Sequence, residues 1–415
     1  MNCSAFVRAV GVAALTALVS PLFAQDPLLW GSLKPGPHAV GYRTEYQFDH
    51  TRRYDPEYGA DAKPAPRPIL VCVWYPAKAT TAKPMAYHKY LDVPSDDPRV
   101  APFAKRLAAH LREVVCEETT GKKPDKLSIA ESTAFERLLA AKTCAVKDAA
   151  AADGKFPVVI HHPGLGGTHD DNSVLFEYLA SRGYVVVSSA YPMANAHLMN
   201  INWDLARSFR DLEFLARSAV GLPFADPDRL GVMGQSYGAQ AAIAWAAEPS
   251  SAVAAVVSLD STVENVGIDH PGFAKLKAHF EANRRNVRAA VLRFASRENK
   301  PKFDTLEPYL KFAPRYEVTV GSLTHNDYIS QGAVRPTLLP DRWHETRAKA
   351  VRRGYDRVCE HTLQFLDMAL KESAEAKTFL EKSVRGDGLD DDFKLVFRPA
   401  SPPPPTARQL AAYTR

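Results

Sequence analysis

A serine flanked by two glycines is the residue best suited to covalent chemistry in this chain of 415 residues. Residues 234–238 read Gly-Gln-Ser-Tyr-Gly, which matches the pattern G-x-S-x-G, with an apolar run before it and an alanine-rich run after it. A sharp strand-to-helix turn exposes such a serine at a sheet edge, and the glycines avoid collisions with the neighbouring strand and helix. The helix N-terminus behind Ser236 would stabilise developing negative charge. The pattern predicts that Ser236 is a nucleophile.

A nucleophilic serine needs a base, and His325 has the most suitable place among the histidines. It follows the last strand of the predicted parallel series and precedes the last long predicted helix, which gives the chain order serine, acid, histidine. His270 follows the serine too soon for this order, and His361 lies in the middle of a predicted helix. We therefore expect His325 to act as general base and then as general acid.

The carboxylate that would orient this base has two candidates. Glu298 follows the predicted strand 287–295, the usual position of the acid in folds with this chain order, whereas Asp260 directly follows the apolar strand 253–259. A short carboxylate at a strand end is held more rigidly than a longer one in a polar loop, and its role is to fix the imidazole tautomer. The residues favour Asp260 and keep Glu298 as the alternative.

A glycine-containing loop follows another predicted strand, in the stretch "VVIHHPGLGG". A loop of this kind can direct a backbone N–H into the space beside a nucleophile. We expect the N–H groups of Leu165 and Tyr237 to form an oxyanion hole. The glycines at 164, 166 and 167 also suit a tight strand-to-helix connection.

Strand-like and helix-like patterns alternate from residue 67 onward, which positions these residues in one sheet. The predicted strands are 67–76, 155–163, 184–192, 229–234, 253–259, 287–295 and 314–320, and the predicted helices are 172–183, 202–219, 237–247 and 353–370. Such alternation is typical of an α/β fold with a mostly parallel central sheet flanked by helices on both faces.

One catalytic domain over residues 25–415 fits this length better than two independent domains. Residues 77–154 interrupt the alternation with helical, alanine-rich sequence and are interpreted as a lid-like insertion beside the site. Residues 398–415 form a proline-rich tail that we expect on the surface.

The first 24 residues have the order of a secretory signal peptide: Arg8, a short apolar run, then Pro21 and Ala24. The run is short for a membrane span, so we expect a secreted or periplasmic protein with no stable membrane span in the mature chain; a retained anchor is the alternative.

The four later cysteines would then meet an oxidising compartment. Cys116 and Cys144 are the ones inside the insertion, and we expect them to form a disulfide, with Cys72 and Cys359 as buried thiols.

Composition excludes some partners. Hydrophobic residues make up 46% and charged residues 24% of the chain, and the net charge of +5 is spread along it, so no nucleic-acid partner is indicated. His161, His162 and His169 lack the spacing of a zinc site and are interpreted as packing or rim residues. The oligomeric state has no sequence signal, and a monomer is the default.

Four stretches carry a family resemblance. "FPVVIHHPGLGG", "DPDRLGVMGQSYGAQ", "AAVVSLDST" and "VTVGSLTHNDYIS" resemble, in the same order, blocks of the α/β-hydrolases of the platelet-activating factor acetylhydrolase-like group, relatives of dienelactone hydrolase and the bacterial polyester hydrolases. The similarity runs roughly from Pro68 to Leu370. It implies an α/β-hydrolase fold, a serine esterase without cofactors, and an acid at the position of Asp260. Gln235 departs from the pattern, since histidine or tryptophan is commoner there.

The function expected from these features is hydrolysis of a carboxylic ester through an acyl-enzyme on Ser236, with a small-molecule or lipid ester as substrate. One alternative is a phospholipase A2-type acetylhydrolase that releases short or oxidised acyl chains from lipids. Another is a hydrolase-like binding module that no longer turns over.

Overall fold

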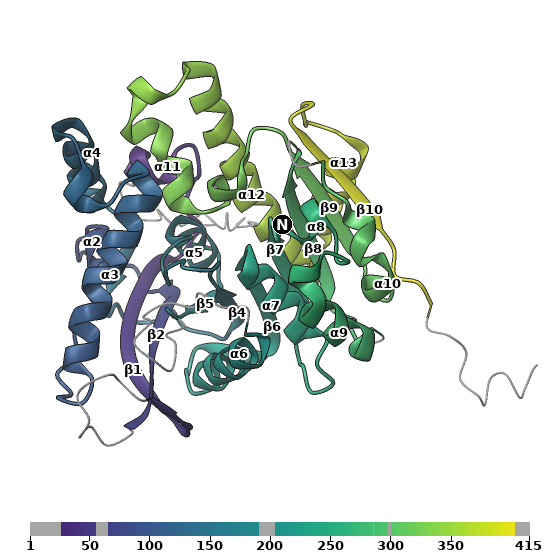
Figure 1. The fold of residues 1–415 in the computed structure, drawn as a ribbon, viewed down its shortest axis with the longest axis horizontal. Coiled ribbons are helices and arrows are strands. Elements are labelled where there is room, and N and C mark those ends of the chain that lie inside the picture. Colours follow the sequence, from purple (N-terminus) through teal and green to yellow (C-terminus); the bar gives the residue numbers. More distant parts are fainter. Residues whose placement is uncertain (1–25, 55–64, 191–203, 285, 298–299, 403–415) are drawn as a thin grey trace, which may run out of the picture.

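A sheet of ten strands runs through the part of the chain that the structure, a computed structural model, describes: residues 26–54, 65–190, 204–284, 286–297 and 300–402 (Figure 1). Its spatial order is β10-β9-β8-β7-β6-β4-β5-β2-β1-β3. The strands are β1(Ala39–Tyr54), β2(Ala65–Ala77), β3(Ala145–Lys147), β4(Phe156–His162), β5(Val185–Ser188), β6(Ala225–Gln235), β7(Ala255–Leu259), β8(Ala290–Ser296), β9(Arg315–Val320) and β10(Phe393–Arg398).

The centre of the sheet is parallel and its margins are mixed. Neighbouring strands from β5 through β4, β6, β7 and β8 to β9 pair in parallel, whereas β2 pairs antiparallel with both β5 and β1, and β10 pairs antiparallel with β9. The carboxyl ends of β6, β7, β8 and β9 therefore meet at one edge, where loops of an α/β sheet build binding sites.

Helices cover both faces of the sheet. One face carries α1(Pro27–Trp30), α5(Ser173–Ser181), α11(Ser330–Leu338), α12(Glu345–Lys371) and α13(Ala374–Arg385), and the other carries α6(Leu205–Val220), α7(Tyr237–Ala246), α8(Val263–Val266), α9(Ala274–Asn283) and α10(Glu307–Leu310). Short 3₁₀ turns complete the connections: η1(Pro124–Lys126), η2(Pro271–Phe273), η4(Phe303–Leu306), η5(His325–Tyr328) and η6(Pro340–Arg342).

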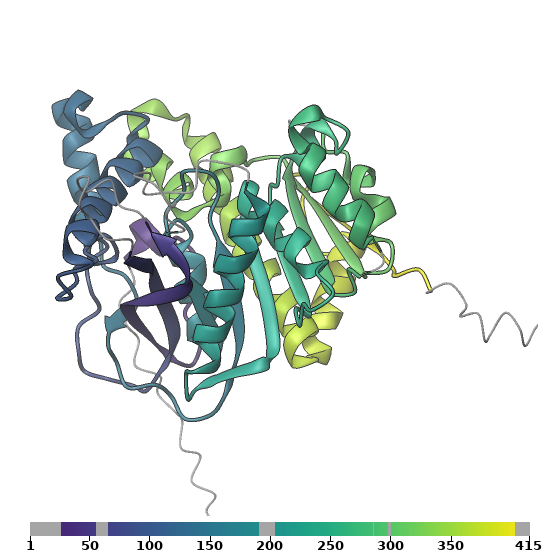
Figure 2. The same cartoon turned by 60° about the horizontal axis from the view of Figure 1, so that its bottom comes forward.

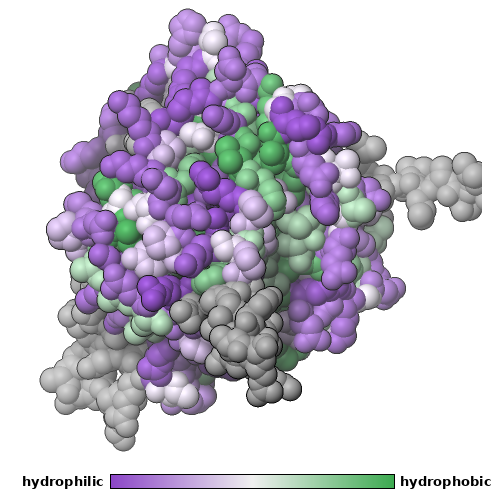
Figure 3. All heavy atoms as spheres, turned by 90° about the vertical axis from the view of Figure 1, so that its right-hand side faces the viewer, coloured by the Kyte–Doolittle hydropathy of each residue, from purple (hydrophilic) through white to green (hydrophobic). Residues whose placement is uncertain are grey.

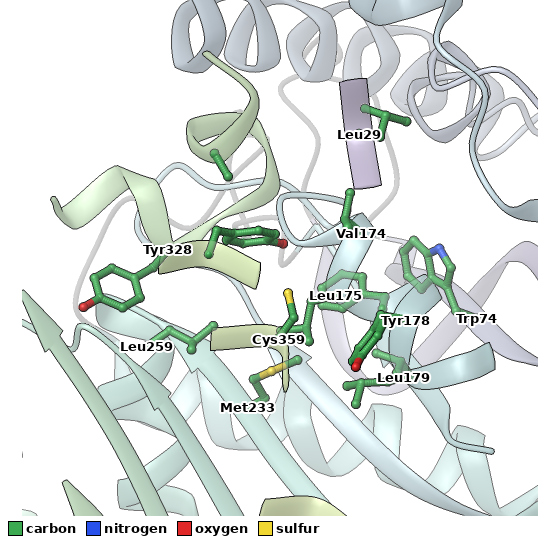
Figure 4. Close-up of a cluster of buried hydrophobic side chains, with 14 of the residues drawn as sticks. Leu29, Trp74, Val174, Leu175, Tyr178, Leu179, Met233, Leu259, Tyr328 and Cys359 are labelled. Atoms are coloured by element: carbon green, nitrogen blue, oxygen red, sulfur yellow. The ribbon is translucent and has the colours of Figure 1, made fainter. Parts of the chain in front are cut away.

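The two faces of the sheet bury two separate hydrophobic clusters, as the alternation of side chains along a strand requires. Met233 of β6 contributes to the cluster under α5 and α12, whereas its neighbour Val232 contributes to the cluster under α6 and α7. Figure 4 shows part of the first cluster, where Leu175 of α5 and Cys359 of α12 lie near Met233.

The insertion at residues 77–154 contains α2(His88–Leu91), α3(Ala101–Thr120) and α4(Ile129–Ala140) and then returns to the sheet. Its helices lie together on the side of the molecule opposite α9 and α10 (Figures 1 and 2). The expectation of a purely helical insertion was incomplete, because β3 adds an edge strand parallel to β1. Since α3 also packs against α11, the insertion is integrated with the main fold.

The predicted fold class is confirmed, and each predicted strand and helix has a counterpart. Most ends shift by four residues or fewer, whereas α12 begins at Glu345, eight residues before the predicted start. The pattern missed β1, β3, β10, α9, α11, α13 and the four-residue helices α1, α8 and α10. In β1 the period of two is present, because Tyr42, Tyr46 and Phe48 lie against the first cluster while polar residues alternate with them, but the sequence prediction of strands began only at residue 67. The predicted signal peptide of residues 1–24 and residues 403–415 of the predicted tail lie outside the described residues.

The predicted disulfide between Cys116 and Cys144 is a wrong prediction, because both cysteines are free and buried. The Cys116 thiol lies at the end of α3 and donates to the Lys122 carbonyl at 3.4 Å. Cys144 lies beside α5, where its backbone N–H donates to Glu177 Oε2 at 2.7 Å. The two sulfur atoms thus belong to different surroundings. Cys72 and Cys359 are buried thiols, as expected.

The face of the molecule shown in Figure 3 is largely hydrophilic. On this face, which lies at the right-hand side of Figure 1, hydrophobic residues gather in one area between hydrophilic ones. No helix in the described ranges has the length and apolar character needed to cross a membrane.

Candidate active site

Ser236 lies at the turn between β6 and α7, at the carboxyl edge of the sheet. Its backbone has φ +55° and ψ −121°, a conformation that L-residues rarely adopt and that sharp turns at functional sites maintain. The Ser236 N–H donates to the Leu259 carbonyl at the end of β7, 3.0 Å away, and this bond holds the turn.

The glycines on both sides of Ser236 are required by close backbone approach. A Cβ atom at Gly234 would lie 2.2 Å from the Gly238 carbonyl carbon. A Cβ atom at Gly238 would lie 2.0 Å from the His162 carbonyl oxygen, at the end of β4. The collisions expected from the sequence pattern are therefore present, and they come from helix and strand respectively.

His325 begins η5, in the connection between β9 and α11. Asp327 holds this turn, because its Oδ2 accepts hydrogen bonds from the Thr324 N–H at 2.8 Å and from the Thr324 hydroxyl at 2.7 Å. The His325 side chain is 35% exposed, so one edge of its ring is accessible.

Asp260 lies directly after β7 and contacts this ring. The distance between His325 Nδ1 and Asp260 Oδ2 is 2.6 Å, and Asp260 is fully buried. The other carboxylate oxygen, Oδ1, accepts the Ser296 N–H at 3.0 Å. A carboxylate in this position favours the imidazole tautomer with the proton on Nδ1, which leaves the Nε2 lone pair available to take a proton.

The other residues considered for these roles lie elsewhere. His270 precedes η2, where its Nδ1 accepts the Gly272 N–H at 3.2 Å. His361 is buried on α12, with its Nδ1 2.9 Å from the Arg357 carbonyl. Glu298, the alternative acid, lies outside the described residues.

The residues predicted as oxyanion-hole donors lie on two elements that meet at Ser236. Tyr237 is the first residue of α7, and Leu165 lies in the loop after β4. Leu165 is 37% exposed, and its N–H donates no hydrogen bond within the described ranges. Gly164 brings the loop close to the nucleophile, since a Cβ atom there would lie 3.2 Å from Ser236 Cβ.

Gln235 makes a contact that the sequence did not predict. Its Nε2 donates to the His325 carbonyl at 3.2 Å and lies 3.3 Å from His325 Nε2. The amide therefore touches the ring nitrogen that would receive the proton of Ser236. The uncommon glutamine at position 235 was a sign of a special contact, but the sequence could not identify its partner, because His325 lies 90 residues away.

A cavity of about 140 Å³ contains both Ser236 and His325 in its wall. The loop after β4 contributes Gly164, Leu165 and Gly167, and α3 of the insertion contributes Val114, Val115 and Glu118. The insertion thus reaches the site, as its predicted position beside the working edge requires. Glu118 and Asp171, which also lines the cavity, were not singled out from the sequence.

The three histidines near the loop are buried packing residues, and none lies at the rim. His161 Nδ1 lies 3.0 Å from Ser188 Oγ, His162 Nε2 lies 3.0 Å from Ser208 Oγ, and His169 Nε2 lies 3.0 Å from the Tyr90 carbonyl. Burial lowers the pKa of all three, that of His162 to about 4. Among the described residues, no group of three or more His, Cys, Asp or Glu side chains is arranged to hold a metal ion.

Comparison with known proteins gives a family match and likenesses to solved structures. Residues 138–280 match the family model described as "Esterase FrsA-like", a range that contains Ser236, Asp260 and the loop after β4 but not His325. The ferulic acid esterase from Streptomyces cinnamoneus, solved at 2.4 Å resolution, is similar in fold, with a TM-score of 0.52 and 18% sequence identity over 82% of this chain and 92% of that chain. No curated protein is significantly similar in sequence.

The assignment of the fold rests on the sheet topology and the structural likeness, and the assignment as an esterase rests on the family match. The narrower resemblance to the acetylhydrolase-like group remains a prediction. The chain is a carboxylic ester hydrolase with the α/β-hydrolase fold.

Proposed function

We propose that this ester hydrolase is a serine esterase in which Ser236, His325 and Asp260 act as a catalytic triad. The observation that carries the proposal is the 2.6 Å contact between His325 Nδ1 and Asp260 Oδ2, beside a cavity whose wall holds both Ser236 and His325. A buried carboxylate, an imidazole and a serine hydroxyl in this order are the groups that acyl transfer requires.

The reaction has two halves. Ser236 Oγ attacks the ester carbonyl carbon while His325 Nε2 takes the hydroxyl proton, and the tetrahedral intermediate then expels the alcohol, which receives that proton. Water next gives a proton to His325 and attacks the acyl-enzyme, which releases the carboxylic acid and restores Ser236. The N–H groups of Leu165 and Tyr237 donate to the oxyanion in both halves.

The Gln235 amide must leave His325 Nε2 during this cycle. Its amide nitrogen lies 3.3 Å from His325 Nε2 in the free protein, and the same nitrogen of the ring has to accept the serine proton. The second Gln235 bond, to the His325 carbonyl, can persist while the ring changes partner.

The substrate proposed is a small ester with a short acyl group. The cavity of about 140 Å³ is smaller than the roughly 300–1,000 Å³ of pockets that enclose drug-sized ligands, so a long acyl chain would extend beyond it. The predicted signal peptide adds the proposal that the enzyme works outside the cytoplasm.

The test compares Ser236→Ala with Ser250→Ala, an exposed serine after α7, on a series of p-nitrophenyl esters from acetate to palmitate. We expect Ser236→Ala to lower kcat by roughly 10⁴-fold or more and Ser250→Ala to leave it unchanged. Turnover by Ser236→Ala at the wild-type rate would refute the proposal. A preference for long-chain or phospholipid esters would instead favour the lipase-type alternative.

A further inference from the structure

The cavity beside Ser236 has carboxyl groups in its wall that the proposed reaction does not use. Glu118 comes from α3 of the insertion, and Asp171 lies in the connection between β4 and α5. The two belong to segments far apart in the sequence, and both line the same space as the nucleophile.

Glu118 lies on the face of α3 that forms the cavity wall, since residues 114, 115 and 118 share one side of a helix. Its Oε2 accepts a hydrogen bond from Asn326 Nδ2 at 3.3 Å, whereas its Oε1 makes no hydrogen bond within the described ranges. Burial raises the pKa of this carboxyl, while the charge of Arg335 acts in the opposite direction. One acceptor oxygen is therefore available to a ligand.

Asp171 supplies an independent observation. The residue is 2% exposed, and its Oδ1 has no hydrogen-bond partner among the described residues, with His161 Nε2 3.4 Å away. Burial raises its pKa well above the usual range, so the protonated carboxyl is favoured, and this form both donates and accepts. Buried polar atoms normally have partners, and Asp171, which contributes to the cavity wall, has only the His161 ring nitrogen near its Oδ1 atom.

We propose that Glu118 and Asp171 form a subsite that binds a hydroxyl group of the ester, which makes short hydroxylated esters the preferred substrates. The inference rests on the proposed function, because the subsite is defined by its place beside Ser236. A hydroxyl donates to Glu118 Oε1 and accepts from a protonated Asp171, whereas a plain alkyl group satisfies neither carboxyl.

A cationic group fits this wall less well than a hydroxyl. The positive charge of Arg335 reaches Glu118, and a protonated Asp171 brings no negative charge to the cavity. An ammonium group would also lack the acceptor that a protonated carboxyl needs.

The experiment measures kcat/KM by acid release for ethyl butanoate, ethyl 3-hydroxybutanoate, 2-hydroxyethyl butanoate and ethyl 3-aminobutanoate. The two hydroxylated esters carry the donor on the acyl and the alcohol side. We expect at least one of them to exceed ethyl butanoate by about tenfold or more, the effect of one hydrogen bond to a buried carboxyl. The amino ester gains no such advantage.

Variants assign the preference to the subsite. Glu118→Leu should reduce the ratio of hydroxylated to plain ester severalfold. Glu118→Gln should reduce it as well, because the amide oxygen keeps the bond from Asn326 Nδ2 and the NH₂ group, which cannot accept, takes the place of Oε1. Glu117→Gln on the exposed side of α3 should leave the ratio unchanged. The ratio is independent of the amount of folded enzyme, so a loss of stability does not imitate the result.

Labelling with a fluorophosphonate distinguishes a failure of the proposed serine-esterase function from a failure of the proposed subsite. A wild-type protein that the probe does not label at Ser236 contradicts the proposed function itself. A labelled protein without preference for either hydroxylated ester, or with a preference for the amino ester, overturns the subsite and leaves the esterase intact.

Discussion

Replacement of Asp260 by asparagine tests the base and its orientation with almost no change of shape. The Oδ1 atom of Asp260 accepts the Ser296 N–H, and Oδ2 accepts the Nδ1 proton of His325. In Asp260→Asn the amide oxygen keeps the Ser296 N–H, because the opposite orientation would bring two donors together. The amide NH₂ then points at His325 Nδ1 and favours the tautomer that carries its proton on Nε2.

That tautomer cannot accept the proton of Ser236. In the active tautomer of His325, the Nδ1–H group would face the asparagine NH₂, and two opposed donors in a buried site cost about 1–3 kcal/mol. The imidazolium formed during the reaction also loses its carboxylate partner, whose Coulomb energy is about 4 kcal/mol at an effective dielectric constant near 20. Together these amount to about 5 kcal/mol or more, so kcat should fall by roughly 10⁴-fold.

The assay is steady-state hydrolysis of a p-nitrophenyl ester, with circular dichroism to compare the folds. Asp304→Asn, an exposed aspartate in η4, is the matched control and should retain full activity. A kcat of Asp260→Asn within tenfold of the wild type would refute the role of Asp260, and the acid would then be sought at Glu298.

Three further predictions concern the loop, the buried carboxyl of α5 and the cysteines. Gly164→Ala should lower kcat about 10- to 100-fold in the same assay, because its Cβ would lie 2.5 Å from Gln235 Oε1 and 3.2 Å from Ser236 Cβ and would displace the loop that carries the Leu165 N–H; unchanged kcat would contradict the role of this loop in the site. Burial raises the pKa of Glu177 to about 7, despite bonds from Trp30 and Tyr90, so its contribution to stability is full below the unfolded value of 4.5 and is lost as the pH rises through 7. In urea unfolding, the free energy of the wild type minus that of Glu177→Gln should therefore fall by about 2–3 kcal/mol from pH 5 to pH 8, and a constant difference would contradict this reasoning. Iodoacetamide should label both Cys116 and Cys144 in protein unfolded without a reductant, and mass spectrometry that finds them linked would contradict the free thiols of the structure.

The nucleophile turn and the parallel strands were predictable because their signals are local. Gly234 and Gly238 lie two residues from Ser236, where a side chain would collide with nearby backbone, and the strand before this turn and the helix after it are strongly patterned. The chain order of Ser236, Asp260 and His325 then followed from the order of the strands.

The wall of the cavity was not predictable in the same way. Glu118 reaches the site because α3 packs against α11, and no spacing rule connects residue 118 with residues 171 or 326. The cysteine pairing failed for the same reason, since membership of one insertion does not bring two thiols together. Contacts between distant segments depend on tertiary packing, which the local pattern does not contain.

Trapping the acyl-enzyme tests the central claim most directly. The wild type and His325→Ala are mixed with p-nitrophenyl acetate, quenched in acid during turnover, digested and mapped by tandem mass spectrometry. We predict one acetyl group on Ser236 of the wild type and a strongly reduced yield in His325→Ala, because the unassisted hydroxyl is a weak nucleophile. Rapid turnover without any adduct on Ser236, or an acetyl group confined to another residue, would contradict the account.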